Sequence, residues 1–91
     1  MLKASIEKEI SLKILGSNIA NWRIGLTHDL RDRYTHWRHT KSLSIEDWFA
    51  WEANSLSDAE AIEKQFIQKG MQGGTGGNLS SGKTVHVYVF A

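Results

Sequence analysis

The sequence predicts one small α/β (α+β) domain, residues 1–91, in which helices flank a three-stranded, mostly antiparallel sheet with element order αβαβαβ. Three observations lead to this fold class. The chain has 91 residues, which is enough for a single hydrophobic core. Its apolar residues switch between helical spacing and the alternation typical of strands. Four tryptophans, three phenylalanines and two tyrosines supply bulky side chains to bury.

The first predicted element is a helix from Leu2 to Leu15. Gly16 stands where the C-cap of this helix would fall. The apolar residues recur about one turn apart at Leu2, Ile6, Ile10 and Ile14. Because the sequence also alternates from Ile10 onward, a strand that begins there is the competing interpretation.

A strand and a second helix follow. The segment from Ala20 to Leu26 alternates, and this pattern predicts a strand. One face would carry Trp22, Ile24 and Leu26, and the other Arg23 and Gly25. Thr27 is then predicted to cap a helix that runs to about Thr40. Its buried stripe would consist of Leu30, Tyr34 and Trp37.

The next two elements are a strand and the clearest helix of the chain. Ser42 and Ser44 indicate a loop, after which the aromatic segment from Asp47 to Ala53 is typical of a strand. Ser57, with Glu60 three residues later, forms a capping-box pattern. The pattern predicts a helix from Asp58 to about Lys69.

The C-terminal part is predicted to be a loop and a central strand. Gly70 would end the third helix and open a glycine-rich loop, residues 70–82, which we expect to be too polar and too rich in glycine to pack. From Thr84 to Phe90 bulky side chains occupy both faces of an alternating segment. A strand of this kind is expected at the centre of a sheet.

Composition excludes several classes of protein. The absence of cysteine rules out a disulfide scaffold, a thiolate metal site and a cysteine nucleophile, and it favours a cytoplasmic location. Charges interrupt the N-terminal segment, so we expect neither a signal peptide nor a membrane helix. The net charge of +1 gives the whole molecule no strong attraction to nucleic acid or anionic lipid.

The charges are nevertheless distributed unevenly along the chain. The basic segment holds Arg23, Arg31, Arg33, Arg38 and Lys41, together with His28, His36 and His39. The acidic segment that follows holds Glu46, Asp47, Glu52, Asp58, Glu60 and Glu63. One interpretation is that the two segments form solvated faces that pair with each other. The other is a basic rim beside an acidic site.

Residues 77–84, GNLSSGKT, match the phosphate-binding loop of nucleoside triphosphatases letter for letter. That loop binds phosphate because a helix begins at its Lys-Thr end and presents N–H groups to the anion. Here Lys83 and Thr84 lead into a predicted strand. We therefore expect that the chain does not bind a nucleoside triphosphate.

Three residues are candidates for a site on their spacing alone. Glu63 lies in the apolar stripe of its helix, where a carboxylate needs a salt bridge, to Arg31 or Arg33, or a metal ion. Arg33 flanks the stripe of the preceding helix and could bind a phosphate in bidentate fashion, or form that same salt bridge. Tyr88 lies in the predicted central strand, where it is either a site residue or an ordinary core tyrosine.

Two blocks of sequence together resemble the GIY-YIG endonuclease family. Residues 23–33, RIGLTHDLRDR, are similar to the Tyr-Ile-Gly strand of that family, its threonine, its helix start and its arginine, which would be Arg33. Residues 58–67, DAEAIEKQFI, are similar to the family helix whose glutamate binds the metal, which would be Glu63. The resemblance covers roughly Trp22 to Ile67.

The chain also departs from the family pattern. Arg23 stands where the family has the tyrosine of Tyr-Ile-Gly, and no Gly-Ile-Tyr block precedes it. Residues 86–90, HVYVF, look like that missing block. The last strand would then take the sheet position that the first strand holds in the family, as in a circular permutation. The histidine of the family helix would fall at Trp37, one residue after His36.

The resemblance implies metal-assisted hydrolysis of a phosphodiester in DNA or RNA. Glu63 would hold Mg²⁺ or Mn²⁺, Arg33 would stabilise the developing charge, and Tyr88 would orient or deprotonate the attacking water. His36 or His86 would serve as an auxiliary base. The nucleic-acid-binding residues would be Arg23, Arg31, Arg38 and Lys41.

Two other functions stay open at this point. The missing tyrosine and the near-neutral charge favour a GIY-YIG-like module that binds nucleic acid or protein without catalysis. A homodimeric interaction protein is the third interpretation, because a three-stranded sheet has edges that need cover.

Overall fold

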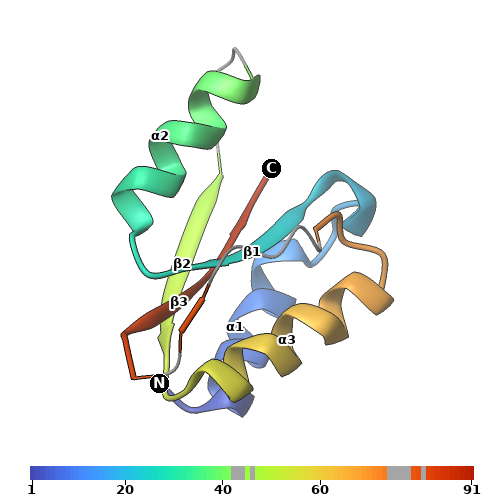
Figure 1. Cartoon of the computed structure of the whole chain (residues 1–91). Coiled ribbons are helices and arrows are strands. Elements are labelled where there is room, and N and C mark those ends of the chain that lie inside the picture. Colours follow the sequence, from blue (N-terminus) through green and yellow to red (C-terminus); the bar gives the residue numbers. More distant parts are fainter. Residues whose placement is uncertain (42–44, 46, 74–78, 81) are drawn as a thin grey trace.

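Three antiparallel strands lie between helices on both faces in the computed structural model of the chain (Figure 1). The structure describes residues 1–41, 45, 47–73, 79–80 and 82–91, except for the side chain of Lys41. The elements in order are α1 (Lys3–Ile14), a 3₁₀ turn (Ile19–Asn21), β1 (Arg23–Thr27), α2 (Leu30–Lys41), β2 (Trp48–Ala53), α3 (Leu56–Gln68) and β3 (Val85–Phe90). This arrangement confirms the predicted fold class.

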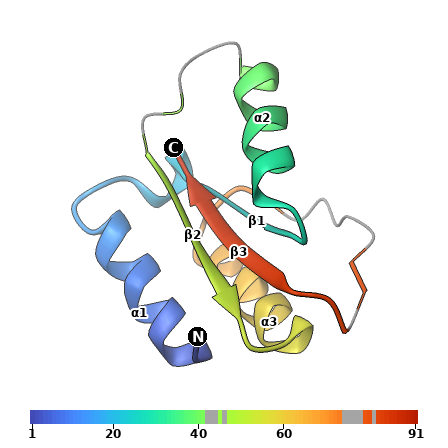
Figure 2. The same ribbon diagram turned by 90° about the vertical axis from the view of Figure 1, so that its left-hand side faces the viewer.

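The C-terminal strand β3 is central, as its sequence predicted. The strand order is β1-β3-β2, and both neighbours run antiparallel to β3. Figure 2 shows the three strands side by side, with β2 next to α1. In this register Tyr88 lies opposite Gly25 on β1 and Ala50 on β2. The largest side chain of β3 is therefore flanked by two of the smallest residues of the sheet.

The core lies between one face of the sheet and the helices α1 and α3. The valines of β3 point to this face and are almost fully buried, together with Ile24 of β1. The helices contribute Ile6, Ile10, Ala59, Ile62 and Phe66, each with no exposed surface. Burial of these apolar side chains is the main contribution to the stability of the fold.

The opposite face of the sheet packs against α2 through an aromatic cluster. Its members are Tyr34 and Trp37 from α2, Trp48 from β2, and Tyr88 and Phe90 from β3. The predicted α2 stripe of Leu30, Tyr34 and Trp37 is only half-buried. The reason is visible in Figure 1, where α2 projects away from the body formed by the sheet and the other two helices.

Two helix starts differ from the prediction. Asp29, and not Thr27, caps α2, because its carboxylate accepts the N–H of Asp32 while Thr27 belongs to β1. Ser55, and not Ser57, caps α3, because its hydroxyl accepts the N–H of Asp58. Each true cap lies two residues from the predicted one, where a second polar residue offered the same pattern.

The other sequence predictions for the N-terminal half have different outcomes. The segment from Lys3 to Ile14 is helical, so the alternative strand from Ile10 is wrong. The predicted strand from Ala20 begins later, at Arg23, because residues 19–21 form the 3₁₀ turn. The loop predicted at Ser42 and Ser44 lies outside the described residues.

The glycine-rich loop is packed at both of its described ends, contrary to the prediction. Met71 is buried, and Gln72 pairs in parallel with Arg23 along the outer edge of β1. At the other end the His28 ring donates from Nδ1 to the carbonyl of Thr84 and accepts from the N–H of Ser80 at Nε2. This pair of bonds requires the neutral, Nδ1-protonated form of His28. Residues 74–78 and 81 lie outside the described part.

None of the helices in the described residues is long and apolar enough to cross a bilayer.

Candidate active site

The side chain of Tyr88 places its hydroxyl at the β1 edge of the sheet. A methyl group added at Gly25 would come within 2.3 Å of both Cζ and Oη of Tyr88. The ring therefore lies directly across Gly25, where only glycine leaves room for it. Because β1 is an edge strand, the hydroxyl lies beside an edge of the sheet.

The ring and the hydroxyl of Tyr88 are held on two sides. The Trp48 ring stacks on it at a centroid distance of 4.9 Å. Trp37 of α2 donates its indole N–H to Tyr88 Oη at 2.9 Å. In this bond the Tyr88 hydroxyl is the acceptor. The proton of the hydroxyl has no acceptor among the residues described. The hydroxyl is therefore left as a free donor.

Charged groups from three elements act on the same hydroxyl. Burial raises the pKa of Tyr88 above its ordinary value, and the negative charge of Glu63 adds to the increase. The bond from Trp37 and the positive charges of Arg33 and Arg23 act in the opposite direction. Arg33 and Glu63, which the sequence analysis had singled out together with Tyr88, thus both contribute to the electrostatic environment of its hydroxyl.

The charge of Glu63 acts on Tyr88 although the helix of Glu63 covers the opposite face of the sheet. The helix α3 packs against β1, the strand over which the Tyr88 ring extends. Burial, followed by the negative charge of Glu60, raises the pKa of the Glu63 carboxyl. The alternative salt bridge to Arg31 or Arg33 is wrong: within the described residues Glu63 has no cationic partner within 4.0 Å.

Arg23 belongs to the same group of side chains. Its guanidinium lies over the Trp37 ring, 4.7 Å from the ring centre. One nitrogen donates to the side chain of Gln72 at 3.3 Å, and Nε is buried without a hydrogen-bond partner in the described part of the chain. Arg23 is therefore a cation held in place by an aromatic ring and an amide.

Other predicted site residues lie apart from Tyr88. Arg31 and Arg38 are exposed on α2, and the side chain of Lys41 is outside what the structure describes. His36 is exposed and meets only the edge of Trp37. His86 shares the sheet face of Tyr88, but among the described residues its ring contacts no member of the site, and its buried Nδ1 has no partner.

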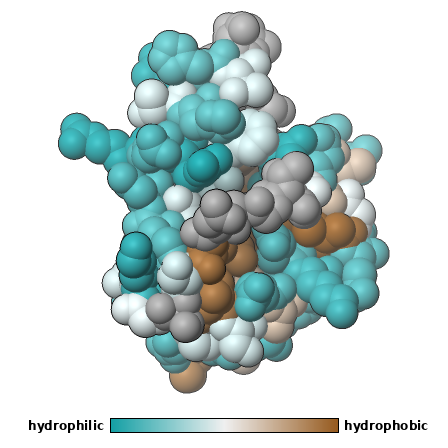
Figure 3. All heavy atoms as spheres, in the orientation of Figure 1, coloured by the Kyte–Doolittle hydropathy of each residue, from teal (hydrophilic) through white to brown (hydrophobic). Residues whose placement is uncertain are grey.

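The basic and acidic segments do not pair with each other in the described residues. The one ion pair found there joins Lys3 and Glu7 within α1. This finding overturns the interpretation of two mutually paired faces for the described members of the two segments; Glu46 and the side chain of Lys41 lie outside the described residues. Figure 3 shows that the surface over α2, at the top of the view, is almost wholly hydrophilic. The arginines of α2 thus form a basic surface that no acidic side chain of the described chain neutralises.

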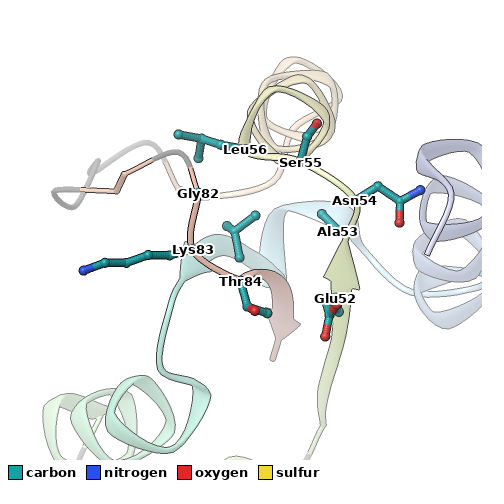
Figure 4. A pocket seen from close by; sticks show the side chains of 9 residues that line it. Glu52, Ala53, Asn54, Ser55, Leu56, Gly82, Lys83 and Thr84 are labelled. Atoms are coloured by element: carbon teal, nitrogen blue, oxygen red, sulfur yellow. The ribbon is translucent and has the colours of Figure 1, made fainter.

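A separate pocket of about 360 Å³ lies at the opposite end of the sheet. Residues 52–56 and 82–85 line it, and it includes no member of the Tyr88 group. Its walls hold the end of the GNLSSGKT run, but Lys83 extends away from the other side chains (Figure 4). After Thr84 the chain enters β3, and not a helix, as the sequence predicted.

Sequence reasoning missed two members of the site, Trp37 and Gly25, and one contact of Arg23. Trp37 was assigned to the core, although its position four residues after Arg33 places the two on one face of α2. Gly25 was read as part of a motif, although its lack of a side chain makes room for Tyr88. The contact of Arg23 with Trp37 depends on how β1 and α2 pack, which no local pattern in the sequence reveals.

No protein-family model, curated protein or solved structure matches this chain. The resemblance to the GIY-YIG family, including the permutation, therefore stays a prediction.

Proposed function

We propose that this chain hydrolyses phosphodiester bonds of DNA or RNA with the help of Mg²⁺ or Mn²⁺. The observation that carries the proposal is the Tyr88 hydroxyl, which accepts the indole N–H of Trp37, lies across Gly25 of β1, and has Arg33 and Glu63 among the charges that shift its pKa. Phosphodiester hydrolysis needs a cation at the phosphate, a means of holding water, and a site for a metal ion. We assign these three roles to Arg33, Tyr88 and Glu63.

Arg33 would stabilise the negative charge that develops on the phosphate. Its guanidinium is half-buried and forms no ion pair with a described residue. A guanidinium can donate two parallel hydrogen bonds to phosphate oxygens. The exposed arginines of α2, Arg31 and Arg38, would bind the neighbouring nucleic-acid backbone.

Glu63 would hold the metal ion. Its carboxylate is half-buried beside Glu60 and lacks a cation among the described residues, so a divalent ion would relieve the repulsion and the desolvation. In the described part of the chain no three His, Asp or Glu side chains are grouped as metal ligands. A single carboxylate donor, Glu63, fits Mg²⁺, which usually combines one or two carboxylates with waters and substrate phosphate. A bound Mg²⁺ or Mn²⁺ would supply Lewis-acid polarisation of the phosphate.

Tyr88 would position the attacking water as a hydrogen-bond donor. Because its pKa is raised, the hydroxyl keeps its proton at neutral pH, and because Trp37 occupies it as an acceptor, the proton points elsewhere. Tyr88 is thus suited to orient the water and poorly suited to deprotonate it. The water oxygen forms a bond to phosphorus and gives up a proton to bulk water, the ester P–O bond breaks, and the leaving oxygen takes up a proton from bulk water.

A non-catalytic GIY-YIG-like module that binds nucleic acid or protein is the second candidate. The specific observation in its favour is Arg23, which occupies the position of a family tyrosine and lies against Trp37. An arginine in place of this tyrosine adds a second cation that favours binding of an anion. It also lacks the hydroxyl that the family tyrosine would contribute to catalysis. Binding of DNA or RNA without cleavage would support this candidate.

Three further statements about partners and location stay predictions. The absence of cysteine favours a cytoplasmic protein. The path of the chain after Thr84 argues against binding of a nucleoside triphosphate. Formation of a homodimer through a sheet edge can be tested by size exclusion with light scattering.

The proposal is tested by incubating the protein with plasmid, single-stranded DNA and RNA in Mg²⁺ or Mn²⁺. We expect metal-dependent cleavage by the wild type, and a loss of about a hundredfold or more in Glu63→Ala and Arg33→Ala. Lys8→Ala, on the exposed side of α1, is the matched control and should cleave like the wild type. Absence of cleavage with every metal, or undiminished cleavage by both folded site variants, would contradict the proposal.

A further inference from the structure

Arg23 presents an incompletely bonded guanidinium beside Tyr88. A guanidinium has five N–H donors. Those of Arg23 make one hydrogen bond within the described residues, to Gln72 at 3.3 Å, and the N–H at Nε is buried with no acceptor. Its position over the Trp37 ring uses none of these donors. The remaining donors are available to an anion.

Arg33 lies on the same side of Trp37. It precedes Trp37 by four residues on α2, and residues at this spacing are neighbours on a helix face. Its side chain forms no hydrogen bond and no ion pair with any described residue. Both arginines are half-buried, which leaves each of them accessible to a ligand from solvent.

Trp37 links the two guanidinium groups to one hydroxyl: Arg23 lies over its ring, Arg33 precedes it by one helical turn, and its indole N–H donates to Tyr88 Oη. Each of them acts electrostatically on Tyr88, whose own proton lacks an acceptor in the described chain. Two cations and a neutral hydroxyl donor at one place match the oxygens of a phosphate group. Neither cation is neutralised by an acidic side chain within ion-pair distance in the region described.

We propose that Arg23 and Arg33 form a clamp for one phosphate group at the Tyr88 hydroxyl, and that the clamp binds phosphate without a metal ion. The inference rests on the proposed function in that the phosphate would be that of the nucleic-acid substrate. It goes further in giving Arg23 a direct role in binding and in separating phosphate recognition from metal binding.

The test is a titration of the wild-type protein with inorganic phosphate in the presence of EDTA. NMR signals of the Trp37 indole N–H and the Arg23 Nε–H should shift first, because these groups surround the clamp. The affinity should fall about tenfold in Arg23→Gln and in Arg33→Gln, since each variant removes charge-assisted hydrogen bonds. Arg23→Lys should bind with intermediate affinity, because it keeps the charge and loses the planar fork.

Lys8→Gln, on α1, is the charge-matched control and should bind phosphate like the wild type. The same titration with a short single-stranded oligonucleotide in EDTA should show the same order of variants. Wild-type affinity in folded Arg23→Gln, or phosphate-induced shifts confined to residues away from Trp37, would overturn the clamp. The wild-type shifts decide the question even where a variant fails to fold.

Because EDTA removes the metal, this result is independent of cleavage. Phosphate binding by a protein that never cleaves would refute the proposed hydrolysis and leave the clamp intact. Metal-dependent cleavage together with unchanged phosphate affinity in Arg23→Gln would refute the clamp and leave the hydrolysis intact.

Discussion

Replacement of Gly25 by alanine is the sharpest perturbation that the structure offers. The new methyl group would meet Cζ and Oη of Tyr88 at 2.3 Å and Cε2 at 2.8 Å. Ordinary carbon contacts are about 3.5–4.0 Å. The ring of Tyr88 would therefore have to move by more than 1 Å, roughly the difference between these distances. Such a movement separates its hydroxyl from the indole N–H of Trp37.

The expected cost follows from two contributions. Overpacking of a well-filled interior costs about 1–3 kcal/mol. Loss of the hydrogen bond between Trp37 and Tyr88 adds about 1 kcal/mol. Gly25→Ala should thus lower the free energy of unfolding by about 2–4 kcal/mol. This is a large part of the total of about 5–14 kcal/mol expected for a chain of this length.

A double-mutant cycle with Tyr88→Leu isolates the collision. Leucine lacks all three atoms that the new methyl group would meet. In this background Gly25→Ala should change the free energy of unfolding by less than about 1 kcal/mol, because alanine is otherwise no worse than glycine in a strand. Urea denaturation followed by tryptophan fluorescence measures all four proteins.

Two outcomes would refute the reasoning. If Gly25→Ala costs the same in both backgrounds, the destabilisation does not come from Tyr88. If it costs nothing in the wild type, the Tyr88 ring does not lie across β1, and its hydroxyl is not where Arg33 and Glu63 could act on it.

Three further predictions concern the same structure. Trp37→Phe keeps the ring and removes the indole N–H, so it should destabilise the fold by about 1 kcal/mol in urea denaturation, whereas no change would argue against the bond to Tyr88. Ser55→Ala should cost about 1 kcal/mol and Ser57→Ala less than half of that, and the reverse order would contradict the position of the α3 cap. Because Tyr88 is less acidic in the folded state, stability should be fully present below pH 10.0 and fall as the pH rises through the folded pKa. Tyr88→Phe should lose this dependence, and an unchanged alkaline pH profile in that variant would refute it.

The elements of the fold could be predicted because each carries a local signal. Helix α3 repeats Ala59, Ile62 and Phe66 at helical spacing, and β3 alternates valines with bulky residues. Bulky side chains on both faces of β3 also predicted that β3 is the central strand, and the topology confirms this position. Helix caps were less predictable because Ser55 and Ser57 both suit the position, and only the backbone path decides between them.

The candidate site was predictable in its residue types and not in its construction. Glu63 stood out because a carboxylate in an apolar stripe costs desolvation energy unless it is paired or binds a metal ion. The bond between Trp37 and Tyr88 joins residues 51 positions apart, and it depends on strand register and helix packing together. The glycine-rich loop packs at its described ends because its apolar side chains, Met71 and Leu79, contact the core, although the composition around them is that of a flexible linker.

The account depends most directly on Glu63 as the metal-holding group of a hydrolytic site. Cleavage of a labelled single-stranded oligonucleotide in Mg²⁺ should therefore be compared among the wild type, Glu63→Gln and the matched control Glu9→Gln on α1. We predict that Glu63→Gln loses cleavage by about a hundredfold while Glu9→Gln keeps the wild-type rate. Equal rates in all three folded proteins, or no cleavage by any of them, would contradict the account.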